Sequence, residues 1–139
     1  MMISESMTID FDVRDMTRVK ELLSHKEALM DCIPGLFRMS DDEFRVVRKI
    51  AFFAFTLNGR ITRFKFEEDQ VVNDVEVWGH GIDLKIHSGF KFPGNGNKVT
   101  FFLEYTLDTS NPIVRAIASR ESKVITADIF ACISRKLLS

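Results

Sequence analysis

Apolar and polar side chains alternate along most of this chain, with the period of two that is typical of half-buried β-strands. Residues 3–13 alternate over most of their length. From Leu36 to Asp108 one candidate strand follows another, with predicted ranges of 43–55, 60–68, 71–78, 82–92 and 98–107. Short connections between such strands predict an antiparallel meander with one apolar face and one face in water.

Glycine, proline and asparagine mark the predicted connections. Asn58-Gly59 is a residue pair typical of a two-residue hairpin turn. Gly79 and Gly81 predict a second break, and the segment 93–96 (PGNG) predicts a turn before the last strand.

Helical spacing occurs on both sides of this stretch. Asp15 is a suitable N-cap for a short helix over 16–24, and a second short helix over 25–31 ends at 32–35 (CIPG). Asn111-Pro112 predicts the start of a long final helix. On a helical wheel, one apolar face of this helix carries Ile113, Ala116, Ile117, Val124, Ala127 and Ala131.

The order of these elements predicts one α+β domain that covers residues 1–139. A curved antiparallel sheet of about seven strands wraps on the long C-terminal helix, and two short helices follow the first strand. The chain contains 13 Phe against one Trp and one Tyr. These rings fill a bulky core, line a large apolar cavity beneath the helix, or do both.

Charge and hydropathy exclude several classes of function. The net charge of −1 provides no basic excess for nucleic acid. The longest uninterrupted apolar run, 50–55, is far shorter than the roughly 18 residues that span a bilayer. The N-terminal residues lack the basic and apolar regions of a signal peptide, so we expect a cytoplasmic protein without a membrane span.

Cysteine and histidine provide no sign of reactive or metal chemistry. Cys32 and Cys132 show no CxxC spacing, so we expect neither a disulfide framework nor a zinc site. His80 and His87 would face opposite sides of a continuous strand because their offset is odd. The sequence predicts no metal, no cofactor and no catalytic residue.

Two arginines are candidate polar anchors inside the predicted cavity. If alternate residues of 43–55 face inward, Arg48 is the one charge in the row formed with Val46, Ile50 and Phe52. It then needs a partner: Glu104, a backbone carbonyl or a ligand carboxylate. Arg120 lies near the apolar face of the final helix. Both arginines could instead reach solvent at an edge or form an internal ion pair. The parity of 43–55 stays open, because Phe53 and Phe55 lie on the other register.

Three segments carry a family resemblance. They are 32–35 (CIPG) after the two short helices, the paired-strand stretch from Phe44 to Glu67, and 77–81 (VWGHG) before the last strands and the final helix. In this order they resemble the START-like (helix-grip, SRPBCC) superfamily, and within it the CoxG-like proteins of carbon monoxide dehydrogenase. The resemblance implies an internal hydrophobic cavity and no shared set of catalytic residues.

These observations predict non-enzymatic binding or transport of a hydrophobic ligand, such as a long-chain fatty acid or a similar lipid. The predicted ligand-binding residues are Arg48, Ile50, Phe52, Phe64, Phe66, Leu84, Ile86, Phe101, Leu103, Tyr105, Ile117, Arg120 and Val124. One alternative is an accessory or assembly protein for a molybdenum hydroxylase, as the CoxG-like resemblance implies. Another is a cyclase- or hydrolase-type enzyme that uses Arg48, Tyr105 or Glu104. The segment 129–133 is apolar on nearly every side of the helix, which also favours a homodimer.

Overall fold

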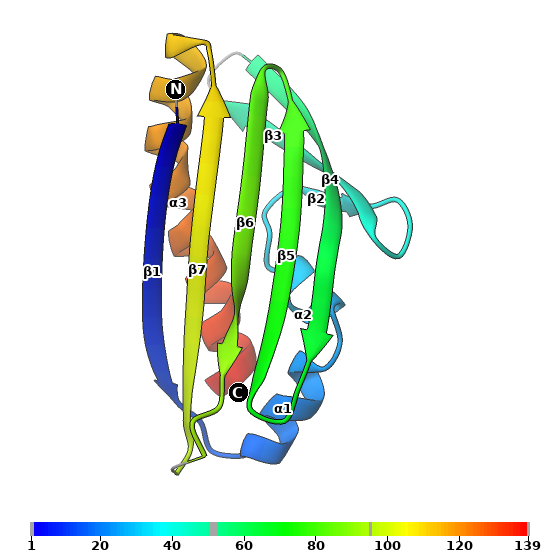
Figure 1. Ribbon diagram of the computed structural model, residues 1–139, viewed down its shortest axis with the longest axis vertical. Helices are drawn as coiled ribbons and strands as arrows, with labels where there is room; N and C mark the ends of the chain where they lie inside the picture. Colours follow the sequence, from blue (N-terminus) through cyan, green and yellow to red (C-terminus); the bar gives the residue numbers. More distant parts are fainter. Residues whose placement is uncertain (1, 51–52, 95, 139) are drawn as a thin grey trace.

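A curved antiparallel sheet wraps one side of a long C-terminal helix in the computed structural model, which describes residues 2–50, 53–94 and 96–138 (Figure 1). The described elements are β1 (Met2–Asp12), α1 (Met16–Leu23), α2 (Glu27–Met30), β2 (Leu36–Arg38), β3 (Glu43–Ile50), β4 (Phe53–Phe66), β5 (Gln70–Gly79), β6 (Ile82–Lys91), β7 (Lys98–Thr109) and α3 (Pro112–Leu138). Across these residues the seven strands form one sheet in the order β1-β7-β6-β5-β4-β3-β2. The predicted α+β fold is confirmed.

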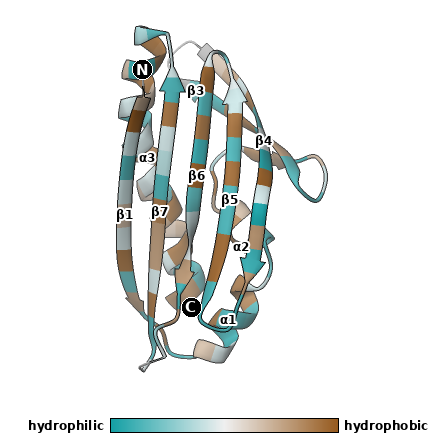
Figure 2. Ribbon diagram, in the orientation of Figure 1, coloured by the Kyte–Doolittle hydropathy of each residue, from teal (hydrophilic) through white to brown (hydrophobic). Residues whose placement is uncertain are grey.

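Strand alternation sends one face of the sheet toward α3. Leu84 and Ile86 of β6 pair with Leu107 and Tyr105 of β7 on that face, and the residues between them point to the other face. Figure 2 shows the resulting alternation of hydropathy along the central strands. The inner face is therefore apolar and the outer face is polar.

The predicted helix starts are confirmed by their caps. The Asp15 carboxylate accepts a hydrogen bond from the backbone N–H of Arg18 at 3.2 Å. The side-chain oxygen of Asn111 accepts one from the N–H of Ile113 at 2.9 Å. Each cap satisfies an N–H that has no partner within its helix.

The predicted hairpin turn at Asn58-Gly59 is wrong, because both residues lie inside β4. The segment 43–55 is also two strands: β3 ends at Ile50 and β4 begins at Phe53, with residues 51–52 outside the described part. Gly59 is opposite Phe44, and a Cβ added at Gly59 would lie 2.1 Å from Cε2 of that ring. The glycine thus makes room for an aromatic ring.

Two groups of buried side chains form the core. One joins β1, α1 and the inner face of β5 to β7 with the C-terminal end of α3, and the other joins α2 to β3, β4 and β5. The fully buried residues of α3 are Ile133 and Leu137, near its C-terminal end. The rest of α3 is only partly buried, so its packing against the sheet is looser toward the N-terminal end.

The apolar segment 129–133 is largely used within the chain. Ile133 is buried, Ile129 and Phe130 pack against the core, and the Phe130 ring lies 5.5 Å from that of Phe101. This segment therefore offers little for the predicted homodimer, which stays a prediction. Over the described ranges, no helix is long and apolar enough to cross a membrane.

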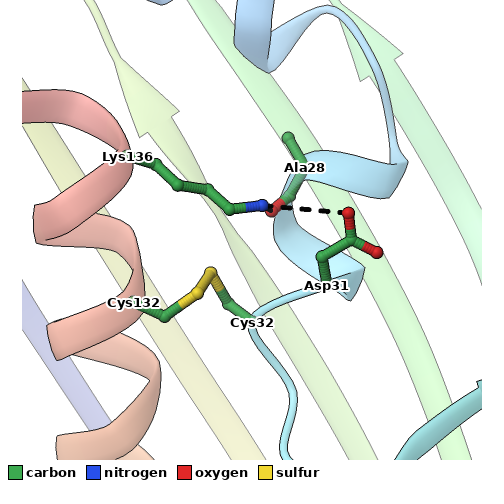
Figure 3. Close-up of a disulfide and its surroundings, with 5 residues drawn as sticks. All are labelled: Ala28, Asp31, Cys32, Cys132 and Lys136. Atoms are coloured by element: carbon green, nitrogen blue, oxygen red, sulfur yellow. Dashed lines mark hydrogen bonds and ion pairs between the residues drawn. A yellow bond between two sulfur atoms is a disulfide. The ribbon is translucent and has the colours of Figure 1, made fainter. Parts of the chain in front are cut away.

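A disulfide joins Cys32 to Cys132, so the expectation of two unpaired cysteines is wrong. Their Cα atoms are 5.5 Å apart although 100 residues separate them in the chain (Figure 3). Nearby, Lys136 Nζ donates a hydrogen bond to the backbone oxygen of Ala28 at 3.0 Å and lies 3.8 Å from an Asp31 carboxylate oxygen. Disulfides persist mainly in oxidising compartments. The bond thus argues against the expected cytoplasmic location, which stays an untested prediction.

Candidate ligand-binding site

A cavity of about 190 Å³, partly open to solvent, lies between the inner face of the sheet and α3. Its walls come from β3 to β7, except β5, and from the part of α3 that precedes the disulfide. The lining residues are Val46, Arg48, Phe55, Leu57, Ile82, Leu84, Ile86, Leu103, Tyr105, Leu107, Val114, Ile117, Ala118, Glu121, Ser122, Ile125, Thr126 and Ile129. Nearly all of the exposed lining surface is apolar.

The cavity has a local cause in the sequence of α3. The residues that face the sheet follow helical spacing from Val114 through Ile125 to Ile129, and Ala118 and Ser122 lie between them. Alanine and serine are too short to fill the space above the curved sheet. An apolar cavity of about 150 Å³ is enough to bind benzene. The cavity beneath α3 therefore has room for a ligand somewhat larger than a single ring.

Six of the residues predicted from the sequence line this cavity, and they are Arg48, Leu84, Ile86, Leu103, Tyr105 and Ile117. The inward parity predicted for Val46 and Arg48 is confirmed, since both line it. Phe55 reaches the cavity from β4, the next strand, rather than from the strand of Arg48. Phe52 lies outside the described residues, and so does the side chain of Ile50.

Three predicted phenylalanines lie away from the cavity. Phe101 is buried in the core with a ring 5.0 Å from that of Phe90. Phe64 packs between the two buried groups, and Phe66 at the end of β4 is 39% exposed. Strand parity identified the inner face correctly, but it gives no position along the strand. Phe55 is a lining ring, whereas most of the described phenylalanines that are buried fill the core.

The predicted apolar face of the final helix is wrong apart from Ile117. Arg120 is exposed, Val124 is 47% exposed and Ile113 is 70% exposed, and none of the three lines the cavity. The helix is apolar on several sides, so a wheel could not identify the buried one. The true inner stripe was hidden because it contains Glu121, Ser122 and Thr126.

Arg48 is paired with Glu121 of α3. Its Nη2 and Nε donate hydrogen bonds to the same Glu121 oxygen, Oε2, at 2.8 and 3.2 Å. The two side chains are 24% and 21% exposed. The partner that Arg48 was predicted to need is therefore Glu121. Glu104 points to the outer face, opposite His87.

Tyr105 provides a second polar contact on the other side of the cavity. Its hydroxyl donates a hydrogen bond to Glu5 Oε2 on β1 at 2.7 Å. Burial, aided by Glu5, raises the pKa of Tyr105 above its ordinary value of 10.0, although a hydrogen bond with Ser122 opposes part of the shift. Tyr105 is therefore a neutral hydrogen-bond donor at physiological pH.

No protein-family model matches the chain, and no curated protein matches it in sequence. Solved structures do match its fold. A conserved protein from Geobacillus kaustophilus has a TM-score of 0.66 at 14% identity, over 97% of this chain and 95% of that one. Truncated norcoclaurine synthase from Thalictrum flavum has a TM-score of 0.66 at 10% identity, over 99% and 96% of the two chains.

Ara h 8.0201 is similar over 96% of this chain and 99% of its own, with a TM-score of 0.58 at 7% identity. At such identities the likeness concerns the fold alone. The chain has the helix-grip fold, a curved antiparallel sheet closed by a long C-terminal helix. Because one of these neighbours is a synthase, the fold does not decide between binding and catalysis.

Proposed function

We propose that this protein binds a small, predominantly apolar molecule in the cavity beneath α3 and holds it without chemical change. The observation that carries the proposal is the cavity of about 190 Å³ with its almost wholly apolar lining. Its two ionised groups, Arg48 and Glu121, are paired with each other, and the Tyr105 hydroxyl is bonded to Glu5. Such a site favours binding over acid–base chemistry.

The volume narrows the class of ligand. Burial yields about 0.8 kcal/mol per methylene, so a ligand of about ten carbons gains on the order of 8 kcal/mol before ordering costs. Net affinities in the micromolar to millimolar range follow. A two-ring or short-chain molecule suits the cavity best. The fatty acid expected from the sequence would extend through the open side, or would require α3 to move.

A matched pair of variants on α3 tests the proposal. Ala118 lines the cavity and Ala116 is exposed two residues earlier, so Ala118→Trp fills the cavity and Ala116→Trp does not. We expect wild type and Ala116→Trp to bind the neutral fluorescent probe N-phenyl-1-naphthylamine with similar affinity. Ala118→Trp should bind it at least about tenfold more weakly. Equal binding by both variants, with helical content unchanged, would place the probe elsewhere and refute the proposal.

The narrower role as an accessory protein for a molybdenum hydroxylase rests on the sequence resemblance to CoxG-like proteins alone. Co-purification of the untagged hydroxylase with the tagged protein is the measurement that would favour that role. A cyclase or hydrolase activity would instead require Tyr105 or Arg48, and turnover abolished by Tyr105→Phe would favour it.

A further inference from the structure

We propose that Glu121 sets the charge selectivity of the cavity: by neutralising Arg48 it makes the site select uncharged ligands, and its loss converts the site into one for carboxylates. The inference rests on the proposed function and specifies the ligand class further. It follows from the position of the pair, since both side chains line the cavity and come from opposite walls, Arg48 from β3 and Glu121 from α3.

The geometry leaves the arginine little capacity for a ligand carboxylate. Two of its donors already converge on Oε2 of Glu121, at 2.8 and 3.2 Å. A ligand carboxylate must therefore displace Glu121, which is 21% exposed and would lose its partner in a largely apolar setting. An unpaired and partly buried carboxylate is unfavourable, so the exchange brings no net gain.

The rest of the lining adds to this discrimination. On the other wall the Tyr105 hydroxyl is bonded to Glu5, which places a second carboxylate beside the cavity. An anionic ligand would thus meet two carboxylates and an arginine that is already neutralised. A cationic ligand would lose its hydration against apolar side chains, and Glu121, which lines the cavity, is already held by Arg48. A neutral molecule with one hydroxyl or carbonyl group avoids both costs.

Three probes with one ring system separate these possibilities: 2-naphthalenemethanol, 2-naphthoate and 2-naphthylmethylamine, titrated near neutral pH by calorimetry. Wild type should bind the alcohol at least about tenfold more tightly than either ion. Glu121→Gln keeps the shape of the side chain and removes its charge. In that variant, binding of the naphthoate should tighten by about tenfold, and binding of the alcohol should change by less than about threefold.

Two control variants make the result specific. Asp128→Asn adds the same net charge on an exposed position of α3 and should leave all three affinities unchanged. The double variant Arg48→Gln/Glu121→Gln removes both charges and should restore the preference for the alcohol. It also covers the case in which the single variant unfolds, because a naphthoate preference in the double variant would contradict the role assigned to Arg48.

Failure of the inference is distinguishable from failure of the proposed function. Equal binding of all three probes by wild type, with loss of binding in Ala118→Trp, would preserve the cavity as the site and overturn its charge selectivity. Tighter binding of the amine or of the naphthoate by wild type would overturn it too. Absence of binding by every probe would overturn both proposals.

Discussion

Gly59 on β4 lies directly opposite Phe44 on β3, and the ring occupies the space where a side chain at Gly59 would begin. The two residues determine how closely β3 and β4 can pack over α2, because Phe44 is buried beside Met30 and Ile61.

Gly59→Ala should therefore destabilise the protein. The added Cβ would lie 2.1 Å from Phe44 Cε2, so the ring must move within a packed core. Overpacking of this kind costs about 1–3 kcal/mol of unfolding free energy. Urea denaturation followed by circular dichroism measures it. Adding Phe44→Leu should recover part of the loss, and two additive losses would show that the ring is not the cause.

Reduction of the Cys32–Cys132 bond should lower stability by about 2–5 kcal/mol, since it frees a loop of 100 residues in the unfolded chain. The measurement is the denaturation midpoint with and without dithiothreitol. The variant Cys32→Ser/Cys132→Ser should be less stable than the oxidised protein and insensitive to the reductant. Two free thiols in the purified, unreduced protein would contradict the pairing.

The single tyrosine allows a direct test of its environment. Because the folded-state pKa of Tyr105 is raised above 10.0, its contribution to stability is complete below that value and is lost as the pH rises through the folded-state pKa. Ultraviolet titration of tyrosinate in the folded protein should give a higher pKa than in denaturant. Tyr105→Phe should remove this part of the alkaline loss of stability, and identical titration curves in both states would contradict the shift.

Arg48 and Glu121 should be more costly to remove singly than together. Each single change leaves a charge about three-quarters buried without its partner, which we expect to cost about 1–3 kcal/mol. Replacing both residues by similarly shaped apolar ones, Arg48→Met/Glu121→Leu, should change the free energy of unfolding by about 1 kcal/mol or less. A double-mutant cycle in urea gives the coupling energy. Strict additivity would mean that the pair contributes no coupling to stability.

The fold was largely predictable from local pattern, since strand alternation and caps such as Asn111-Pro112 act over a few residues. The same alternation separates Leu84 and Ile86 from Lys85 and His87, and it assigned the inner face of β6 correctly. The dipeptide Asn58-Gly59 misled because a glycine that makes room for a distant ring looks, in sequence, like a glycine that makes a turn.

The site was only half predictable, because its extent depends on where α3 crosses the sheet. Parity placed Phe101 on the inner face, but its position along β7 places it in the core rather than in the cavity. On α3 the inner stripe contains Glu121, which is stable there because Arg48 lies opposite. A pairing between residues so far apart in the chain leaves no mark in the local hydrophobic pattern, and the Cys32–Cys132 bond was missed for the same reason.

That bond also changes the topology of the covalent chain. It closes a ring that contains β2 to β7 and most of α3, and only β1, α1, α2 and the last turns of α3 lie outside it. A protease that cuts within the ring, for example in the exposed turn at His80 and Gly81, would open the circle without releasing a fragment. The cut protein would migrate as one species on a non-reducing gel and separate into two pieces only after the sulfurs are reduced.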